Sequence, residues 1–170
     1  MGISEKLNLS GSRSFYGTTK LSSELFIQEY AAFYNMQAAI TRFGVIAGPR
    51  QMGKADQGVA TLWMAKHFWN NPLKYIGYGG TGKQLRDILH INDVFNLIDL
   101  QIHQIEKFTN KIFNAGGGLS NSVSLLEMTH ICEKITGNKV QISKETQNRP
   151  ADLRAYISNN TKIETEINKF

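Results

Sequence analysis

Residues 16–24 read Tyr16-Gly-Thr-Thr-Lys20-Leu-Ser-Ser-Glu24, and residues 37–46 read Gln37-Ala-Ala-Ile-Thr-Arg-Phe-Gly-Val-Ile46. The first stretch belongs to a longer pattern, from about Ser14 to Tyr34, whose apolar residues recur at helical spacing and predict a helix. The second is short, partly β-branched and stopped by Gly48-Pro49, so it predicts a strand. A helix that leads directly into a strand is the repeating element of an α/β protein.

The alternation of strands and helices continues along the chain. Ser124 and Glu127 form an S-x-x-E capping box that predicts a helix start, and Gly137 is expected to end that helix. The chain is expected to open in a loop and to end inside a helix without a cap, which indicates a fragment. Other helices are predicted at 56–69, after a cap at Asn92 or Asp93, and from 159; strands are predicted at 74–76, 85–91, 111–115 and 140–143.

The composition is that of a globular domain. The chain has 170 residues, of which 41% are hydrophobic and 19% charged, and its formal net charge is +5. The basic residues form no run, so we expect no nucleic-acid partner, although the net charge alone leaves that alternative open. No segment is long enough to span a bilayer and no apolar signal region opens the chain, so we expect a cytoplasmic protein without a membrane partner.

Metal and disulfide chemistry are not indicated either. Cys132, the one cysteine, sits in an apolar helical pattern that predicts burial. The four histidines show no metal-ligand spacing, so no metal is expected.

One stretch, Gly77-Tyr-Gly-Gly-Thr-Gly-Lys83, matches two phosphate-loop patterns by letter. A phosphate loop must lead from a strand into a helix, because the helix N-terminus supplies the N–H groups that bind phosphate. Here the following residues predict a strand, so we expect a hairpin turn instead of a phosphate loop.

Tyr16 and Lys20 lie four residues apart, which places both on one face of a helix. A phenol has a pKa near 10, too high for a base at neutral pH, and a neighbouring cation lowers it. The pair is therefore suited to proton transfer coupled to hydride transfer. The alternative interpretation is an ordinary helix with Tyr16 half buried and Lys20 in solvent. On either interpretation Lys20 and Glu24 are an i,i+4 pair that supports the helix.

Five motifs that follow one another along the chain favour the catalytic interpretation of Tyr16 and Lys20. The motifs are Tyr16-Gly-Thr-Thr-Lys20-Leu-Ser-Ser-Glu24, Arg42-Phe-Gly-Val-Ile-Ala-Gly-Pro49, Arg86-Asp-Ile-Leu-His-Ile-Asn-Asp-Val94, Phe113-Asn-Ala-Gly-Gly117 and Arg149-Pro-Ala-Asp152. Together they resemble the extended short-chain dehydrogenase/reductase family, the NAD-dependent epimerases and dehydratases. The fold that this resemblance implies is the rear part of an NAD(P)-binding Rossmann-type α/β protein with its C-terminal substrate-binding region.

The resemblance implies NAD as cofactor and assigns roles near it. Tyr16 would be the general acid and base, and Lys20 would lower its pKa and hydrogen-bond the nicotinamide ribose. Phe43 would pack against the nicotinamide. Gln57 lies in the segment that faces the sugar nucleotide. The implied reaction is a transient oxidation of a sugar carbon, after which hydride returns to the other face.

The substrate implied by the resemblance is a nucleotide-diphosphate sugar. Arg86 and Arg149 match positions that clamp the diphosphate, and guanidinium pairs bidentately with phosphate. Asp152 matches a carboxylate that contacts the nucleotide ribose. From the residues alone, Arg86 could instead form a local ion pair with Asp87. Val45 departs from the family, because an Asn that contacts the sugar nucleotide usually stands there.

Two runs, 51–58 and 75–87, resemble most closely the CDP-paratose 2-epimerases (CDP-tyvelose epimerases), so a CDP-sugar and reaction at C2 are favoured. Residues 1–50 would end the Rossmann domain, and residues 51–170 would bind substrate and include returning Rossmann elements, truncated at the C-terminus. A 4,6-dehydratase, a decarboxylase and a non-catalytic binding or redox-sensing module are the alternatives.

The family's glycine-rich NAD loop and its catalytic Ser or Thr are not found in the 170 residues. The chain alone is therefore expected to be inactive, while a full-length parent, with a homodimer as the expected assembly, is expected to be active.

Overall fold

The computed structural model describes residues 2–11, 14–54, 58–149 and 152–168. Strands and helices alternate along them, which confirms an α/β protein. The elements are α1 (Phe15–Tyr34), β1 (Ala39–Phe43), β2 (Val45–Ala47), α2 (Val59–Phe68), β3 (Leu73–Ile76), the short 3-10 turn η1 (Tyr78–Gly80), β4 (Leu85–His90), α3 (Ile91–His103), α4 (Ile105–Phe108), β5 (Lys111–Ala115), β6 (Ser122–Ser124), α5 (Leu125–Thr136), β7 (Ile142–Glu145), β8 (Ala155–Tyr156) and α6 (Thr161–Ile167).

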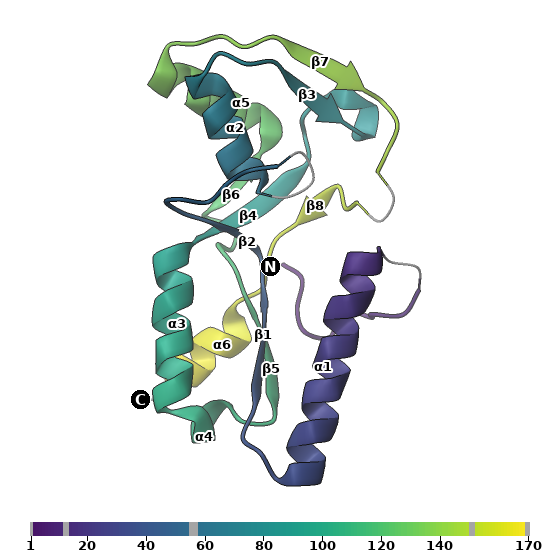
Figure 1. Ribbon diagram of the computed structural model, residues 1–170, viewed down its shortest axis with the longest axis vertical. Coiled ribbons are helices and arrows are strands. Elements are labelled where there is room, and N and C mark those ends of the chain that lie inside the picture. Colours follow the sequence, from purple (N-terminus) through teal and green to yellow (C-terminus); the bar gives the residue numbers. More distant parts are fainter. Residues whose placement is uncertain (1, 12–13, 55–57, 150–151, 169–170) are drawn as a thin grey trace.

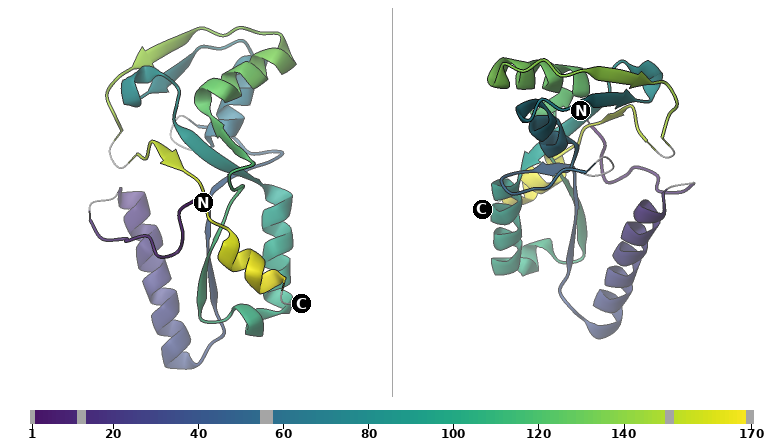
Figure 2. Two further views of the ribbon diagram at one scale, coloured as in Figure 1. Left: turned by 180° about the vertical axis from the view of Figure 1, so that it is seen from behind. Right: turned by 45° about the horizontal axis from the view of Figure 1, so that its top comes forward.

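Three small sheets organise these elements. β1 pairs in parallel with β5, and β3 pairs in parallel with β7. β4 is the centre of the third sheet, where it pairs in parallel with β2 and β8 and antiparallel with β6. Helices α1 and α3 lie on opposite sides of the β1–β5 pair, while α2 and α5 lie together beside β3 and β7 (Figures 1 and 2). The chain thus returns to β1 through β5 after it has formed α2, β3 and β4, and it adds α5 and β7 beside α2 and β3 afterwards.

Helix α1 begins as predicted. The Ser14 Oγ accepts a hydrogen bond from the Gly17 N–H at 3.1 Å, and the helix ends at Asn35, which adopts a left-handed conformation. Of its described residues only Ala31 is buried. Most of its apolar residues, including Phe26 and Phe33, are exposed.

The expected pair between Lys20 and Glu24 is not what holds this helix. The Glu24 carboxylate instead accepts hydrogen bonds from the Arg42 guanidinium, at 2.6 to 3.1 Å, with both side chains largely buried. The hydrogen bond to Glu24 raises the pKa of Arg42. Because Arg42 lies on β1, this ion pair attaches α1 to the sheet that follows it.

The strand predicted at 37–46 is divided into β1 and β2 at Gly44. At this point the chain passes from the β1–β5 pair to the sheet of β4. A Cβ atom on Gly44 would lie 3.1 Å from the Asp87 Oδ1 and 3.2 Å from the Ser158 Oγ, so the crossing leaves little room for a side chain.

Two predictions about turns and caps were wrong. The Gly77–Lys83 stretch does lead into a strand, but β3 and β4 pair with different partners, so it does not close a hairpin. Instead it carries the chain from one sheet to another. Helix α3 is capped by His90, whose Nδ1 accepts from the Asn92 N–H at 3.2 Å, and not by Asn92 or Asp93.

The C-terminal elements agree more closely with the elements predicted from the sequence. The Ser124–Glu127 capping box is present in both directions, and α5 ends at Gly137 as predicted. β7 begins two residues later than predicted. α6 ends at Ile167, and the Asn168 N–H donates to the Glu164 carbonyl. The prediction of a last helix without a cap was therefore wrong for the described residues.

The larger buried cluster joins α2, β3 and α5. Trp63 is 3% exposed, and its ring stacks on that of Tyr75 with centroids 5.9 Å apart. Both side chains bond the Thr129 hydroxyl, at 2.9 and 2.8 Å. Cys132 is buried in the same cluster, as predicted. The cluster fixes the position of α2 against β3, and a cavity opens between these elements and β4.

Candidate functional site

A cavity of about 570 Å³ lies between α2, β3, β4 and the segment that precedes β8. This volume suits a small organic ligand. Apolar side chains cover much of its wall, among them Val45, Leu62, Trp63, Ile88 and Met128.

Charged groups gather around this apolar wall. The described residues that line the cavity include five cationic side chains and one carboxylate: Lys54, Lys66, Lys74, Arg86, Arg149 and Asp152. A concave site with an excess of positive charge attracts anionic ligands. The three lysines were not singled out from the sequence, because only the fold brings residues 54, 66 and 74 to one wall.

Three residues predicted to bind substrate meet in this cavity. The Arg86 Nη2 donates to the Asp152 Oδ1 at 2.7 Å, and its Nη1 donates to the Leu85 carbonyl at 2.8 Å. Arg149 lines the same cavity. The Arg86 partner is thus Asp152, 66 residues away, and not the adjacent Asp87 as the local alternative would require.

Alternate residues along β4 line one side of the cavity. Gln84, just before the strand, and Arg86 and Ile88 within it all line the cavity, as expected for alternate residues that share one face. Ile88 is paired with Val45 of β2. The opposite face carries Asp87, which is fully buried.

Asp87 closes the junction between the sheets. Its Oδ2 accepts from the Ser158 N–H at 3.0 Å and from the Gly118 N–H at 3.2 Å. A Cβ atom on Gly116 would collide with the Asp87 carboxylate and the Ser158 hydroxyl. Gly116 of the Phe113–Gly117 motif is therefore needed for close packing. Asp87, the neighbour of Arg86, stabilises the junction between the sheets and does not line the cavity.

The predicted acid/base pair lies on another element. Tyr16 and Lys20 are in the first turns of α1 and both are exposed, with the Lys20 Nζ 5.3 Å from the centre of the Tyr16 ring. They are not among the described residues that line the cavity. The end of α1 that carries them is the end nearer to β8 (Figures 1 and 2). The two groups are adjacent, as the spacing predicts, and their phenol and ammonium are accessible to a ligand.

Two other predicted residues are placed differently. Phe43 is half-buried at the end of β1, next to the division at Gly44, and it also lies outside the lining of the cavity. Gln57 lies outside the described residues. The roles of all these residues stay predictions.

Another tyrosine, Tyr156, is a poor candidate for the base. Burial raises the pKa of its phenol, and the nearby Asp87 carboxylate raises it further. A phenol whose pKa is raised further above neutral pH is less suited to act as the base.

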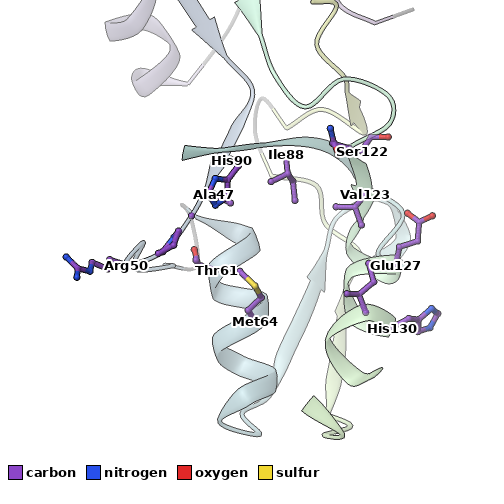
Figure 3. A pocket seen from close by; sticks show the side chains of 14 residues that line it. Ala47, Arg50, Thr61, Met64, Ile88, His90, Ser122, Val123, Glu127 and His130 are labelled. Atoms are coloured by element: carbon purple, nitrogen blue, oxygen red, sulfur yellow. The ribbon is translucent and has the colours of Figure 1, made fainter. Parts of the chain in front are cut away.

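A second cavity, of about 980 Å³, is lined by residues of α2, β4 and α5 (Figure 3), and it shares Ile88 and Val123 with the lining of the first. Its wall includes Arg50, Met64, His90, Glu127 and His130. Among the described residues, no group of three or more His, Cys, Asp or Glu side chains is arranged to hold a metal ion. No motif indicated this cavity, because its lining residues come from four separate segments.

The parallel strand pairs with flanking helices place the chain in the α/β class, and the basic cavity and the Tyr16–Lys20 pair are its candidate functional features. A family model described as the NAD dependent epimerase/dehydratase family matches residues 2–116. The chain belongs to this family.

Among curated proteins, the chain is 28% identical to a CDP-paratose 2-epimerase of Salmonella typhi, over 89% of this chain and 45% of that protein. It is 32% identical to a putative UDP-glucose 4-epimerase of Methanocaldococcus jannaschii, over 65% of this chain and 34% of that protein. The chain therefore spans half or less of the length of these relatives.

Solved structures give the same picture of the fold. Pal from Bacillus thuringiensis matches 98% of this chain and 50% of its own with a TM-score of 0.80 and 28% identity. A UDP-glucuronic acid 4-epimerase from Bacillus cereus matches 97% of this chain and 49% of its own with a TM-score of 0.82 and 24% identity. The described residues include no helix that is long and apolar enough to cross a membrane.

Proposed function

We propose that these residues carry the acid/base pair and the substrate cavity of a nucleotide-sugar epimerase that uses NAD. One observation carries the proposal: Arg86 from one motif and Arg149 and Asp152 from another line one cavity together with three lysines. A diphosphate is the anion that this arrangement fits, because guanidinium groups bind phosphate oxygens bidentately. The apolar wall suits the flat face of a base.

The chemistry of the proposed reaction divides between cofactor and protein. NAD, when bound, would supply reversible hydride acceptance. Tyr16 would take the proton of the sugar hydroxyl and later return it, while Lys20 would stabilise the phenolate and hydrogen-bond a ribose hydroxyl. The observed geometry fits these roles, because the two exposed groups are adjacent. Phe43 would pack against the nicotinamide.

The finer assignments follow from the relatives and the motifs. We favour a CDP-sugar with reaction at C2, on the likeness to the Salmonella typhi CDP-paratose 2-epimerase. Gln57 would face the sugar nucleotide, and Asp152 its ribose. We also propose that residues 1–50 end the Rossmann domain and residues 51–170 form the substrate region, so that the 170 residues match the rear part of the relatives. A 4,6-dehydratase or decarboxylase would use the same residues, and product analysis separates the three.

We propose in addition that a longer protein containing these residues is a homodimer formed through α1. Phe26, Tyr30 and Phe33 follow one another at i, i+4 and i+7 and are 65%, 57% and 82% exposed. Exposed apolar stripes of this kind mark protein contacts. Phe33→Glu is expected to weaken the dimer at least about tenfold in sedimentation velocity, whereas Phe68→Glu on α2 serves as the matched control. Equal effects of the two would contradict the assignment to α1.

Arg86→Met tests the proposed substrate directly. The variant is expected to raise the Kd for a nucleoside diphosphate sugar about 10- to 100-fold, because a charge-assisted hydrogen bond is lost. The unpaired Asp152 carboxylate would then also repel the diphosphate. Titration calorimetry on the 170-residue chain measures this effect.

The control is Lys83→Met, which removes an exposed cation just before β4. Lys83 does not line the cavity. Its Kd should stay within about twofold of the unmodified chain, since an exposed charge outside the cavity contributes little. An Arg86 variant that binds as tightly as the Lys83 variant would contradict a diphosphate site at Arg86.

A further inference from the structure

Gln84 is a polar residue at the cavity wall that no motif assigned. Its side chain is 6% exposed and lines the cavity. The Nε2 donates to the Ile76 carbonyl of β3, while the Oε1 has no hydrogen-bond partner among the described residues. A buried amide oxygen without a donor is uncommon, because leaving it unpaired costs free energy. A bound group that carries a donor would satisfy it.

The position of Gln84 along the cavity indicates which part of a ligand it meets. Gln84, Arg86 and Ile88 line the cavity in this order, about 6 to 7 Å apart from one residue to the next. Nucleotide sugars have a matching linear order of base, diphosphate and sugar. Arg86 would bind the diphosphate, and the part of the cavity near Val45 of β2 would hold the sugar. Gln84 then lies at the end of the cavity that would hold the base.

The chemistry of the amide narrows the choice of ligand group. The Ile76 carbonyl uses one of the two Nε2 hydrogens, while the Oε1 is an acceptor only and has no partner among the described residues. Pyrimidine bases offer a donor on the edge that pairs in nucleic acids, the N3–H of uracil or the N4 amino group of cytosine. Phosphates and ionised carboxylates offer none. The free Oε1 therefore fits the base and not the anionic part of the ligand.

We propose that the Gln84 Oε1 accepts a hydrogen bond from an N–H group of the nucleobase and thereby contributes to base specificity. The proposal rests on the proposed function, since it takes a nucleotide sugar as the ligand. It adds a residue that recognises the uncharged end of that ligand. The three lysines and two arginines would bind any polyphosphate, so discrimination between bases needs a group of this kind.

The test compares Gln84→Met with the unmodified 170-residue chain by titration calorimetry. The ligands are UDP, CDP and inorganic pyrophosphate, of which pyrophosphate has the charges but no base. Met keeps the size of the side chain and removes both hydrogen-bonding groups. We expect the variant to bind UDP or CDP about tenfold more weakly and pyrophosphate equally well, as loss of one buried hydrogen bond implies. Equal losses for all ligands, or no loss for any, would overturn the proposal.

A second measurement uses the unmodified chain, so that it does not depend on the folding of a variant. Methylation of the uracil N3, or dimethylation of the cytosine N4, removes the donor. We expect one of these analogues to bind about tenfold more weakly than its parent nucleotide, and which one it is identifies the base. If neither loses affinity, Gln84 does not read an N–H group. If the chain binds neither nucleoside diphosphates nor pyrophosphate, the proposed function itself fails, which is a different result.

Discussion

Tyr16→Phe is expected to lower kcat about 10²- to 10⁴-fold in a polypeptide that joins these residues to an NAD-binding half. The substitution removes only the phenol oxygen, which under the proposed function takes the proton of the sugar hydroxyl. KM for the nucleotide sugar should change little, because Tyr16 is not among the described residues that line the basic cavity. Product formation followed by NMR gives both quantities.

Tyr34→Phe is the matched control for this substitution. Tyr34 lies on the same helix and is 61% exposed, close to the 63% of Tyr16. Its loss should leave kcat within about twofold, since most exposed substitutions have small effects. A Tyr16 variant that keeps kcat within the same range would exclude Tyr16 as the acid/base group.

The second large effect concerns the core beneath the cavity. Trp63→Ala is expected to lower the free energy of unfolding by about 3 to 5 kcal/mol, because it removes a large buried ring and leaves a void. It also removes the stacking on Tyr75 and leaves the Thr129 hydroxyl with one bond fewer. Since Trp63 lines the cavity, ligand binding should fall with stability. Urea unfolding followed by circular dichroism measures the change.

The two tryptophans of the chain provide their own comparison. Trp69 follows α2, is 71% exposed and contacts Phe68. Trp69→Ala should cost about 1 kcal/mol or less, because little buried area is lost. Similar losses for both variants would mean that the cluster around Trp63 does not hold α2 against β3.

Local signals in the sequence were sufficient for much of the fold. The Ser124–Glu127 capping box, the Ser14 start of α1 and the Gly137 end of α5 each depend on residues within one turn, and each was predicted correctly. The prediction of a hairpin at 77–83 was wrong, because the pairing of a strand depends on partners that are distant in the sequence. β3 pairs with β7, which follows about 70 residues later, and no feature of the loop reveals that choice.

The difference between local signals and long-range contacts also explains which residues of the candidate site were predicted from the sequence. Tyr16 and Lys20 were singled out because four further motifs follow them, and their spacing predicted the adjacency that a helix gives them. Arg86, Arg149 and Asp152 were found only through a resemblance, since 66 residues separate the Arg86–Asp152 pair. Lys54, Lys66, Lys74 and Gln84 were missed, because their importance comes from a cavity that exists only after α2, β3 and β4 have packed.

The central claim is that the basic cavity binds a nucleotide sugar, and titration of the unmodified 170-residue chain with a CDP-sugar tests it most directly. We expect one binding site per chain, with an affinity that falls as salt is raised, because much of the binding is electrostatic. We also expect competition by pyrophosphate and none by the free sugar. The absence of saturable binding, or binding of the free sugar with equal affinity, would contradict it.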